Sequence, residues 1–158
     1  MSLYVTKLKA NVLFHKFMTL PRRGKWLHCN TVLWLITVKA GLYLLPFDLL
    51  RGWVAPPGKP PSSGPVAIEE VREITEAIER LGRLLAPLQI NCLPQALVGQ
   101  KLLRRKGFNA QLKIGVLKNR DDLLTAHAWL EYQGLVILGN LRGLKQFTAF
   151  PSLEIAQQ

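Results

Sequence analysis

The sequence predicts an α+β domain in which two helices precede an antiparallel sheet. Apolar residues recur at helical spacing over residues 66–86, and from Asn109 they alternate with polar residues at a period of two. Residues 125–138 then contain two segments rich in strand-forming residues, separated by Gln133 and Gly134. Helices followed by hairpin-connected strands are typical of the α+β class.

Length and composition allow one compact domain with a helical extension. The chain has 158 residues, of which 49% are hydrophobic, and this is enough to bury a core. Its two cysteines, Cys29 and Cys92, stand far apart, so neither a disulfide framework nor a four-ligand zinc site is indicated. The sequence also lacks a phosphate-binding glycine motif. We therefore expect no metal, no cofactor and a reducing, cytoplasmic location.

Charge and proline content divide the chain into three segments. Residues 1–54 are apolar and basic, residues 55–65 form a proline- and glycine-rich linker, and residues 66–158 are expected to form the α+β domain. Residues 1–64 hold nine Lys or Arg and the single acid Asp48. This excess indicates an anionic partner, which the charge alone does not identify among acidic peptides, membrane surfaces and nucleic acids.

Residues 31–47 are the most apolar stretch of the chain and raise the question of a membrane span. Lys39 lies near the middle, where it would cost roughly 2.5–3.5 kcal/mol on insertion, and the stretch is shorter than the ~20 residues that a span requires. We expect a buried or peripheral helix, so that membrane contact is at most peripheral. The lysines of the first segment also argue against a secretory signal.

Two helices are expected before the sheet. The helix over residues 66–86 has acidic residues early and arginines late, as the helix dipole favours. Its apolar positions are Ile68, Val71, Ile74, Ile78, Leu81 and Leu85. A second helix should begin close to Cys92, because Pro94 is tolerated in a first turn, and should end at Gly107. Cys92 would therefore lie at a helix N-terminus.

The period-two pattern predicts which side chains share a face of the sheet. His127, Trp129 and Glu131 should lie on one side of the strand over residues 125–132. If Gln133-Gly134 is a two-residue turn, paired residue numbers sum to 267, and His127 then lies opposite Asn140. At that position an Asn140 side-chain oxygen would be within reach of the imidazole.

These positions indicate nucleophilic catalysis. A lone cysteine is more often a small buried hydrophobe, but at a helix N-terminus the unpaired amides and the dipole stabilise a thiolate. His127 is the single histidine in the sheet portion, whereas His15 and His28 lie in the basic front segment. The sequence thus suggests a Cys-His-Asn arrangement of Cys92, His127 and Asn140.

The combined motifs resemble those of the lasso-peptide biosynthesis B proteins. The segments that carry the resemblance are NCLPQAL at 91–97, LLRRKG at 102–107, IGV at 114–116, and AHAWLE at 126–131 with Gly134. Their order and spacing agree with that family over roughly residues 66–153. The segment LLPF at 44–47 also looks like the family's helical front end.

The resemblance implies a transglutaminase-like, papain-related fold and a leader peptidase that matures a ribosomally made precursor. Cys92 and His127 map onto the family's nucleophile and base. The third member is commonly an aspartate, where this chain offers Gly139-Asn140, so we expect Asn140 to take that role. The implied partners are the precursor peptide, a leader-binding recognition protein and an ATP-dependent lasso cyclase.

Two other functions are compatible with the catalytic residues or with the basic charge of the front segment. An acyl transferase of this fold would use Cys92 and His127 alike but pass the acyl group to an amine. A non-catalytic protein would bind nucleic acid or anionic lipid through its basic front segment. Since no nucleic-acid-binding motif is present, we expect no nucleic-acid partner.

Overall fold

The computed structural model describes residue 19 and residues 21–54, 65–118 and 124–150. Its elements in chain order are α2 (Arg22–Leu44), α3 (Phe47–Val54), α4 (Pro65–Leu84), the 3-10 turn η1 (Ala86–Leu88), α5 (Cys92–Arg105), β1 (Gln111–Lys118), β2 (Leu124–Tyr132), β3 (Leu135–Leu138), the 3-10 turn η2 (Leu144–Gln146) and β4 (Thr148–Ala149). The predicted α+β class is confirmed. Most of the expected linker, residues 55–64, lies outside the described residues.

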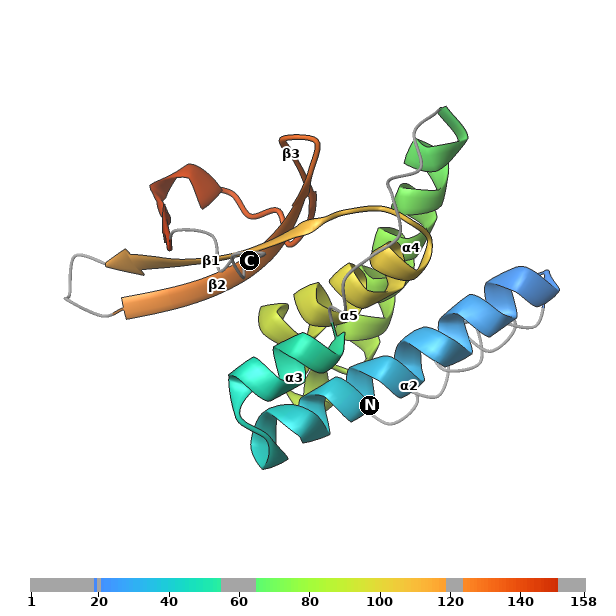
Figure 1. Ribbon diagram of the computed structural model, residues 1–158, viewed down its shortest axis with the longest axis horizontal. Coiled ribbons are helices and arrows are strands. Elements are labelled where there is room, and N and C mark those ends of the chain that lie inside the picture. The colour runs from blue at the N-terminus through green and yellow to red at the C-terminus, as the bar shows by residue number, and fades with distance from the viewer. Residues whose placement is uncertain (1–18, 20, 55–64, 119–123, 151–158) are drawn as a thin grey trace, which may run out of the picture.

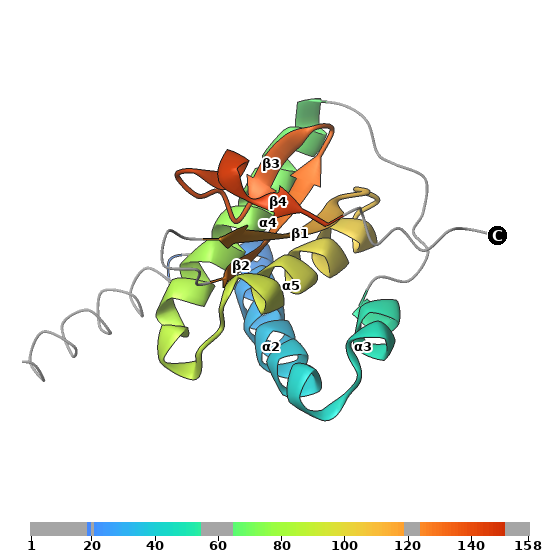
Figure 2. The same cartoon turned by 90° about the vertical axis from the view of Figure 1, so that its left-hand side faces the viewer.

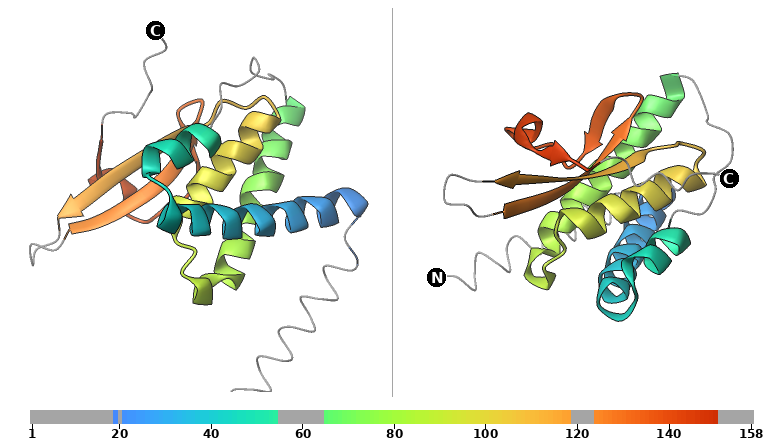
Figure 3. Two further views of the ribbon diagram at one scale, coloured as in Figure 1. Left: turned by 60° about the horizontal axis from the view of Figure 1, so that its bottom comes forward. Right: turned by 60° about the vertical axis from the view of Figure 1, so that its left-hand side comes forward.

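The sheet has helices on one face and the C-terminal segment on the other. Its four antiparallel strands lie in the order β3-β2-β1-β4. In Figures 1, 2 and 3, α4 and α5 lie on one side of the sheet and the red segment around η2 lies on the other. A Cβ at Gly99 of α5 would come within 2.8 Å of Leu130 and Leu138, so α5 packs directly on β2 and β3.

The two central helices form where the apolar spacing predicted them. In α4 the inward residues Val71, Ile74 and Ile78 are buried, whereas outward residues form ion pairs such as that of Arg72 with Glu69, 2.7 Å apart. In α5, Pro94 occupies the first turn, and arginines in the last turn complement the helix dipole. This packing places the first residue of α5 at the edge of the core.

The front helices belong to the same core. Leu35 and Val38 of α2 and Leu50 of α3 have no exposed surface and pack with residues of α4 and α5. Most of the apolar stretch at 31–47, expected to form a buried or peripheral helix, lies in α2. This helix begins earlier, at Arg22, and the chain turns at Leu45 and Pro46 before α3. Proline at that point cannot continue the helical hydrogen bonds.

A lysine from α5 links the two front helices. Lys101 Nζ lies 4.2 Å from the ring centre of Trp34 and 4.8 Å from that of Trp53, and it donates to the Trp53 carbonyl oxygen at 3.2 Å. A cation between two indole faces is a favourable electrostatic arrangement. It attaches α2 and α3 to the helix that begins with Cys92.

Among the described residues, α2 is the one helix that is long and apolar enough to cross a membrane by length and composition. This is weak evidence, because core helices and signal sequences meet the same criterion.

The β2–β3 hairpin has the expected turn but not the expected register. Gln133 and Gly134 both have positive φ, 51° and 77°, as a two-residue turn of type I′ requires. Tyr132 pairs with Leu135 as predicted, but a bulge follows, so that Leu130 pairs with Leu138 and the ladder ends. The expected pairing of His127 with Asn140 is therefore wrong, because one extra residue on β3 shifts the register.

Candidate active site

Cys92 is the first residue of α5 and is half-buried. The preceding Asn91 is extended and makes no side-chain cap. Pro94 has no amide hydrogen, and the Gln95 amide donates to the Asn91 carbonyl oxygen. Within the described part of the chain, no hydrogen bond uses the backbone amides of Cys92 and Leu93. These two donors are thus available to an oxygen anion beside the thiol.

The side chain of Gln95 stabilises the chain segment that precedes Cys92. The side-chain Nε2 of Gln95 donates to the Ile90 carbonyl oxygen at 2.9 Å. Its side chain also occupies the space beside Gly82 of α4, where an added Cβ would come within 2.5 Å of it. The residues before Cys92 are therefore connected both to α5 and to α4.

His127 of β2 is held on three sides. Its Nε2 lies 2.7 Å from the Gly139 carbonyl oxygen. The ring stacks on Trp129, with centres 6.2 Å apart and planes inclined by 13°, and Phe147 packs against it at 5.8 Å. These contacts leave 9% of the residue exposed, so the orientation of the imidazole is well defined.

The stack depends on the indole of Trp129. Trp129 Nε1 donates to Glu131 Oε1 at 2.8 Å, and the ring lies over Gly115, which pairs with His127. An added Cβ at Gly115 would come within 2.9 Å of the Trp129 ring. The predicted common face of His127 and Trp129 is confirmed, and glycine on the neighbouring strand gives the indole its space.

Cys92 and His127 come from two elements that pack together, α5 and β2. Helix α5 packs on the face that carries Ala128 and Leu130, whereas His127 and Trp129 lie beneath residues 139–150. Among the described residues, no hydrogen bond joins Cys92 to His127, and none uses Nδ1 of the ring. The structure therefore places helix and strand together without a thiol–imidazole hydrogen bond. Such bonds are often long before substrate binds.

Asn140 is exposed, and within the described ranges no hydrogen bond joins it to His127. The acceptor at Nε2 is instead the carbonyl of Gly139, whose φ of 78° suits glycine. A Cβ at Gly139 would come within 2.9 Å of the Ala128 carbonyl oxygen. The sequence prediction placed an Asn140 side-chain oxygen beside the imidazole, and in the structure the Gly139 carbonyl oxygen occupies that position.

The other histidines and cysteine lie elsewhere. In α2, His28 Nδ1 contacts the Gly24 carbonyl oxygen at 2.8 Å, and Cys29 is exposed. His15 lies outside the described residues. A search of the described part of the chain found no group of three or more His, Cys, Asp or Glu that could hold a metal ion.

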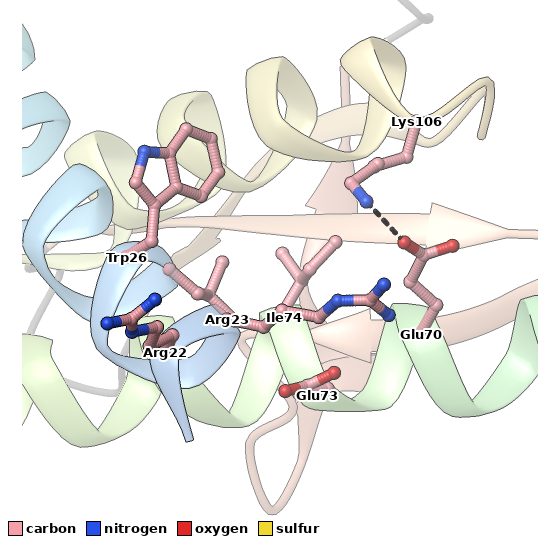
Figure 4. A pocket seen from close by; sticks show the side chains of 8 residues that line it. Arg22, Arg23, Trp26, Glu70, Glu73, Ile74 and Lys106 are labelled. Carbon is pink, nitrogen blue, oxygen red and sulfur yellow. Dashed lines mark hydrogen bonds and ion pairs between the residues drawn. The ribbon is translucent and has the colours of Figure 1, made fainter. Parts of the chain in front are cut away.

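A pocket of about 600 Å³ lies at the other end of α5 (Figure 4). It is lined by residues from the start of α2, from α4 and from the end of α5: Arg22, Arg23, Trp26, Leu27, Glu70, Glu73, Ile74 and Lys106. Lys106 Nζ pairs with Glu70 Oε1 at 2.6 Å. Because α5 has 14 residues, roughly 20 Å of helix separates this pocket from Cys92.

Comparison with known proteins identifies the superfamily of the chain. A family model described as the transglutaminase-like superfamily matches residues 34–152, which include Cys92, His127 and Asn140. The match begins within α2, so it takes in part of the front helices. Searches of curated proteins and of solved structures returned no match.

Proposed function

This chain belongs to the transglutaminase-like superfamily, and from that premise we propose that it is a cysteine peptidase that removes the leader peptide from a lasso-peptide precursor. The fold is of the kind used by cysteine peptidases and acyl transferases. The observation that carries the proposal is Cys92 at the start of α5, with two backbone amides beside it and the buried His127 on the strand against which α5 packs.

The finer assignment to lasso-peptide maturation has support in the motifs. The segment from Asn91 to Leu97 and the AHAWLE segment at 126–131 resemble those of the B proteins in order and spacing. The resemblance also supplies the proposed partners, a leader-binding protein that delivers the precursor and an ATP-dependent cyclase that uses the product. We place this reaction in the cytoplasm.

The proposed reaction begins when Nδ1 of His127 takes the proton of the Cys92 thiol. Nε2 has its acceptor in Gly139, so Nδ1 is the nitrogen left for this step. The thiolate attacks the scissile carbonyl carbon, and the resulting oxygen anion accepts from the amides of Cys92 and Leu93. The precursor must bring sulfur and Nδ1 within hydrogen-bond distance as it binds.

Collapse of this intermediate breaks the peptide bond. His127 gives its proton to the leaving amine, so the core peptide departs with a new N-terminus while the leader stays on Cys92 as a thioester. Water then attacks the thioester as His127 takes its proton, and the thiol is restored on release of the leader carboxylate. The Gly139 carbonyl is the acceptor that orients His127, and Asn140, the residue after it, is proposed to have a secondary part in this role.

Mass spectrometry of precursor incubated with the protein and a leader-binding partner tests the proposal. Cys92→Ala should abolish cleavage with folding intact, and Cys29→Ala should leave it unchanged. Cleavage by Cys92→Ala would end the hypothesis. A leader released as an amine adduct rather than a free carboxylate would identify an acyl transferase instead.

A further inference from the structure

The outward face of α2 carries an apolar stripe. Exposed residues recur there at spacings of three and four, which keeps them on one side of a helix. They are Trp26, Cys29, Leu33, Ile36, Ala40, Tyr43 and Leu44. Leu33 is 63% exposed and Leu44 is 80% exposed, so these side chains lie largely in solvent.

The stripe lies on the opposite side of the helix from the core face. The buried residues of α2 are Gly24, Thr31, Leu35, Val38 and Gly41, and at 100° per residue they centre about half a turn from the stripe. A helix between a core and water usually has a polar outer face. Helix α4 follows that rule with Glu69, Arg72, Glu73, Glu76 and Arg80 outward, and α2 does not.

The apolar surface continues from α2 onto α3. Leu45, Leu49 and Trp53 are also about half exposed or more. Of the fifteen large hydrophobic residues exposed in the described part of the chain, eight lie between residues 26 and 53. Such a concentration in two helices that contact each other indicates an interaction surface.

Charge identifies the kind of partner. The cations of α2 and α3 are Arg22, Arg23, Lys25, Lys39 and Arg51, and the one acid is Asp48. Lys25 and Lys39 border the stripe, and Lys39 Nζ lies 4.9 Å from the ring centre of Tyr43. A second copy of the chain would bring these positive charges together, which opposes a dimer. An apolar stripe bordered by cations suits the headgroup region of an anionic bilayer.

Packing excludes α2 as a membrane span in this fold. Leu35 and Val38 have no exposed surface, and both belong to the core shared with α4 and α5. Insertion across a bilayer would remove them from that core. We infer that α2 lies parallel to a membrane surface and, with α3, docks the folded protein on bilayers that contain anionic lipids. This inference does not rest on the chemistry of Cys92.

Co-sedimentation of the full chain with vesicles tests the inference. We expect binding to equimolar phosphatidylcholine and phosphatidylglycerol, weakened by added salt, and little binding to phosphatidylcholine alone. The double variant Leu33→Glu/Ile36→Glu should bind these vesicles at least roughly tenfold more weakly than the unmodified protein, because two charges replace apolar side chains at the centre of the stripe. The matched control is Leu124→Glu/Leu135→Glu, which changes exposed leucines on the sheet and should bind like the unmodified protein.

Four results would overturn the inference. They are absence of binding to the mixed vesicles, equal binding to uncharged vesicles, binding unaffected by the Leu33/Ile36 change, and resistance to alkaline carbonate, which would make α2 an integral segment. Analytical ultracentrifugation tests the alternative that the stripe forms a dimer interface. A dimer that the Leu33→Glu/Ile36→Glu variant loses would assign the stripe to a second copy. Circular dichroism confirms that each variant is folded.

Discussion

The carbonyl oxygen of Gly139 accepts a hydrogen bond from Nε2 of His127 across 2.7 Å. This contact places the proton on Nε2 in the neutral ring and leaves Nδ1 as the basic nitrogen. A backbone carbonyl has no net charge, so it orients the imidazole and supports the imidazolium less than a carboxylate does. The orientation of the base therefore depends on where the backbone turns after β3.

Substitution of Asn140 tests whether its side chain or the Gly139 carbonyl orients the imidazole of His127. Because Gly139 already accepts from Nε2, Asn140→Ala should retain turnover within roughly tenfold of the unmodified enzyme. Asn140→Asp should match or exceed the unmodified enzyme, since a nearby negative charge favours the imidazolium. Turnover is measured by mass spectrometry of precursor cleavage.

The control for Asn140 is His127→Ala, which should be inactive. If Asn140→Ala were as inactive as that control, the side chain of Asn140, and not the Gly139 carbonyl, would orient the base.

Alkylation of Cys92 reports on the thiol–imidazole pair without substrate turnover. In a Cys29→Ala background, which removes the exposed thiol, iodoacetamide should label Cys92 more slowly after His127→Ala, because the thiolate has lost its partner. Addition of precursor should enlarge the difference. Equal labelling rates with bound precursor would argue against His127 as the base.

Gly115 should be sensitive to any added side chain. Gly115→Val would force the Trp129 ring from its place, since even a Cβ would approach within 2.9 Å of it. We expect a loss of about 1–3 kcal/mol in the free energy of unfolding, together with lower activity. Urea denaturation gives the first quantity.

Gly52→Ala in α3 is the matched control, because an added Cβ there meets no atom within 4 Å. Alanine should raise the free energy of unfolding by about 0.5–1 kcal/mol. If Gly115→Val were as stable as this control, Trp129 would have room to rearrange.

Lys101 should contribute to the docking of α2 and α3 on α5. Lys101→Met removes the hydrogen bond to the Trp53 carbonyl oxygen, which a neutral amine also makes, and should lower the free energy of unfolding by about 1 kcal/mol. Lys145→Met, on an exposed site, should have no effect. An unchanged free energy for Lys101→Met would show that apolar packing alone holds the two front helices.

The same lysine predicts a pH dependence. Burial lowers the pKa of Lys101 from its ordinary 10.5, and the charge of Arg105 lowers it further. The unfolded chain then binds the proton more tightly, so the free energy of unfolding should rise with pH between the lowered pKa and 10.5. Lys101→Met should lack this rise when denaturation is repeated across that pH range.

The parts of the fold that depend on local patterns were predictable. Apolar spacing identified α4, Pro94 marked the first turn of α5, and Gln133-Gly134 identified the hairpin turn. Each of these follows from residues that are neighbours in sequence. The common face of His127 and Trp129 followed equally from the period of a strand.

The features that depend on tertiary contacts were not predictable. The bulge between Leu130 and Glu131, with the extra residue on β3, changes the register by one residue, and nothing in the alternation of β3 marks it. The pairing of β4 with β1 joins residues that are more than thirty positions apart. The Gly139 acceptor follows the bulge and has a positive φ, and neither feature could be read from the strand alternation.

The position of β4 in the chain has a consequence for the order of folding. The α4–α5 pair and the β1–β2–β3 hairpins join nearby segments, whereas Ala149 must return across the whole meander to reach Gly115. Among the strand pairings this is the longest loop and closing it costs the most chain entropy, so β4 is the strand expected to form last. Phe147, which covers His127, precedes β4 directly. The β1–β2–β3 hairpins are therefore expected to form before the imidazole is enclosed.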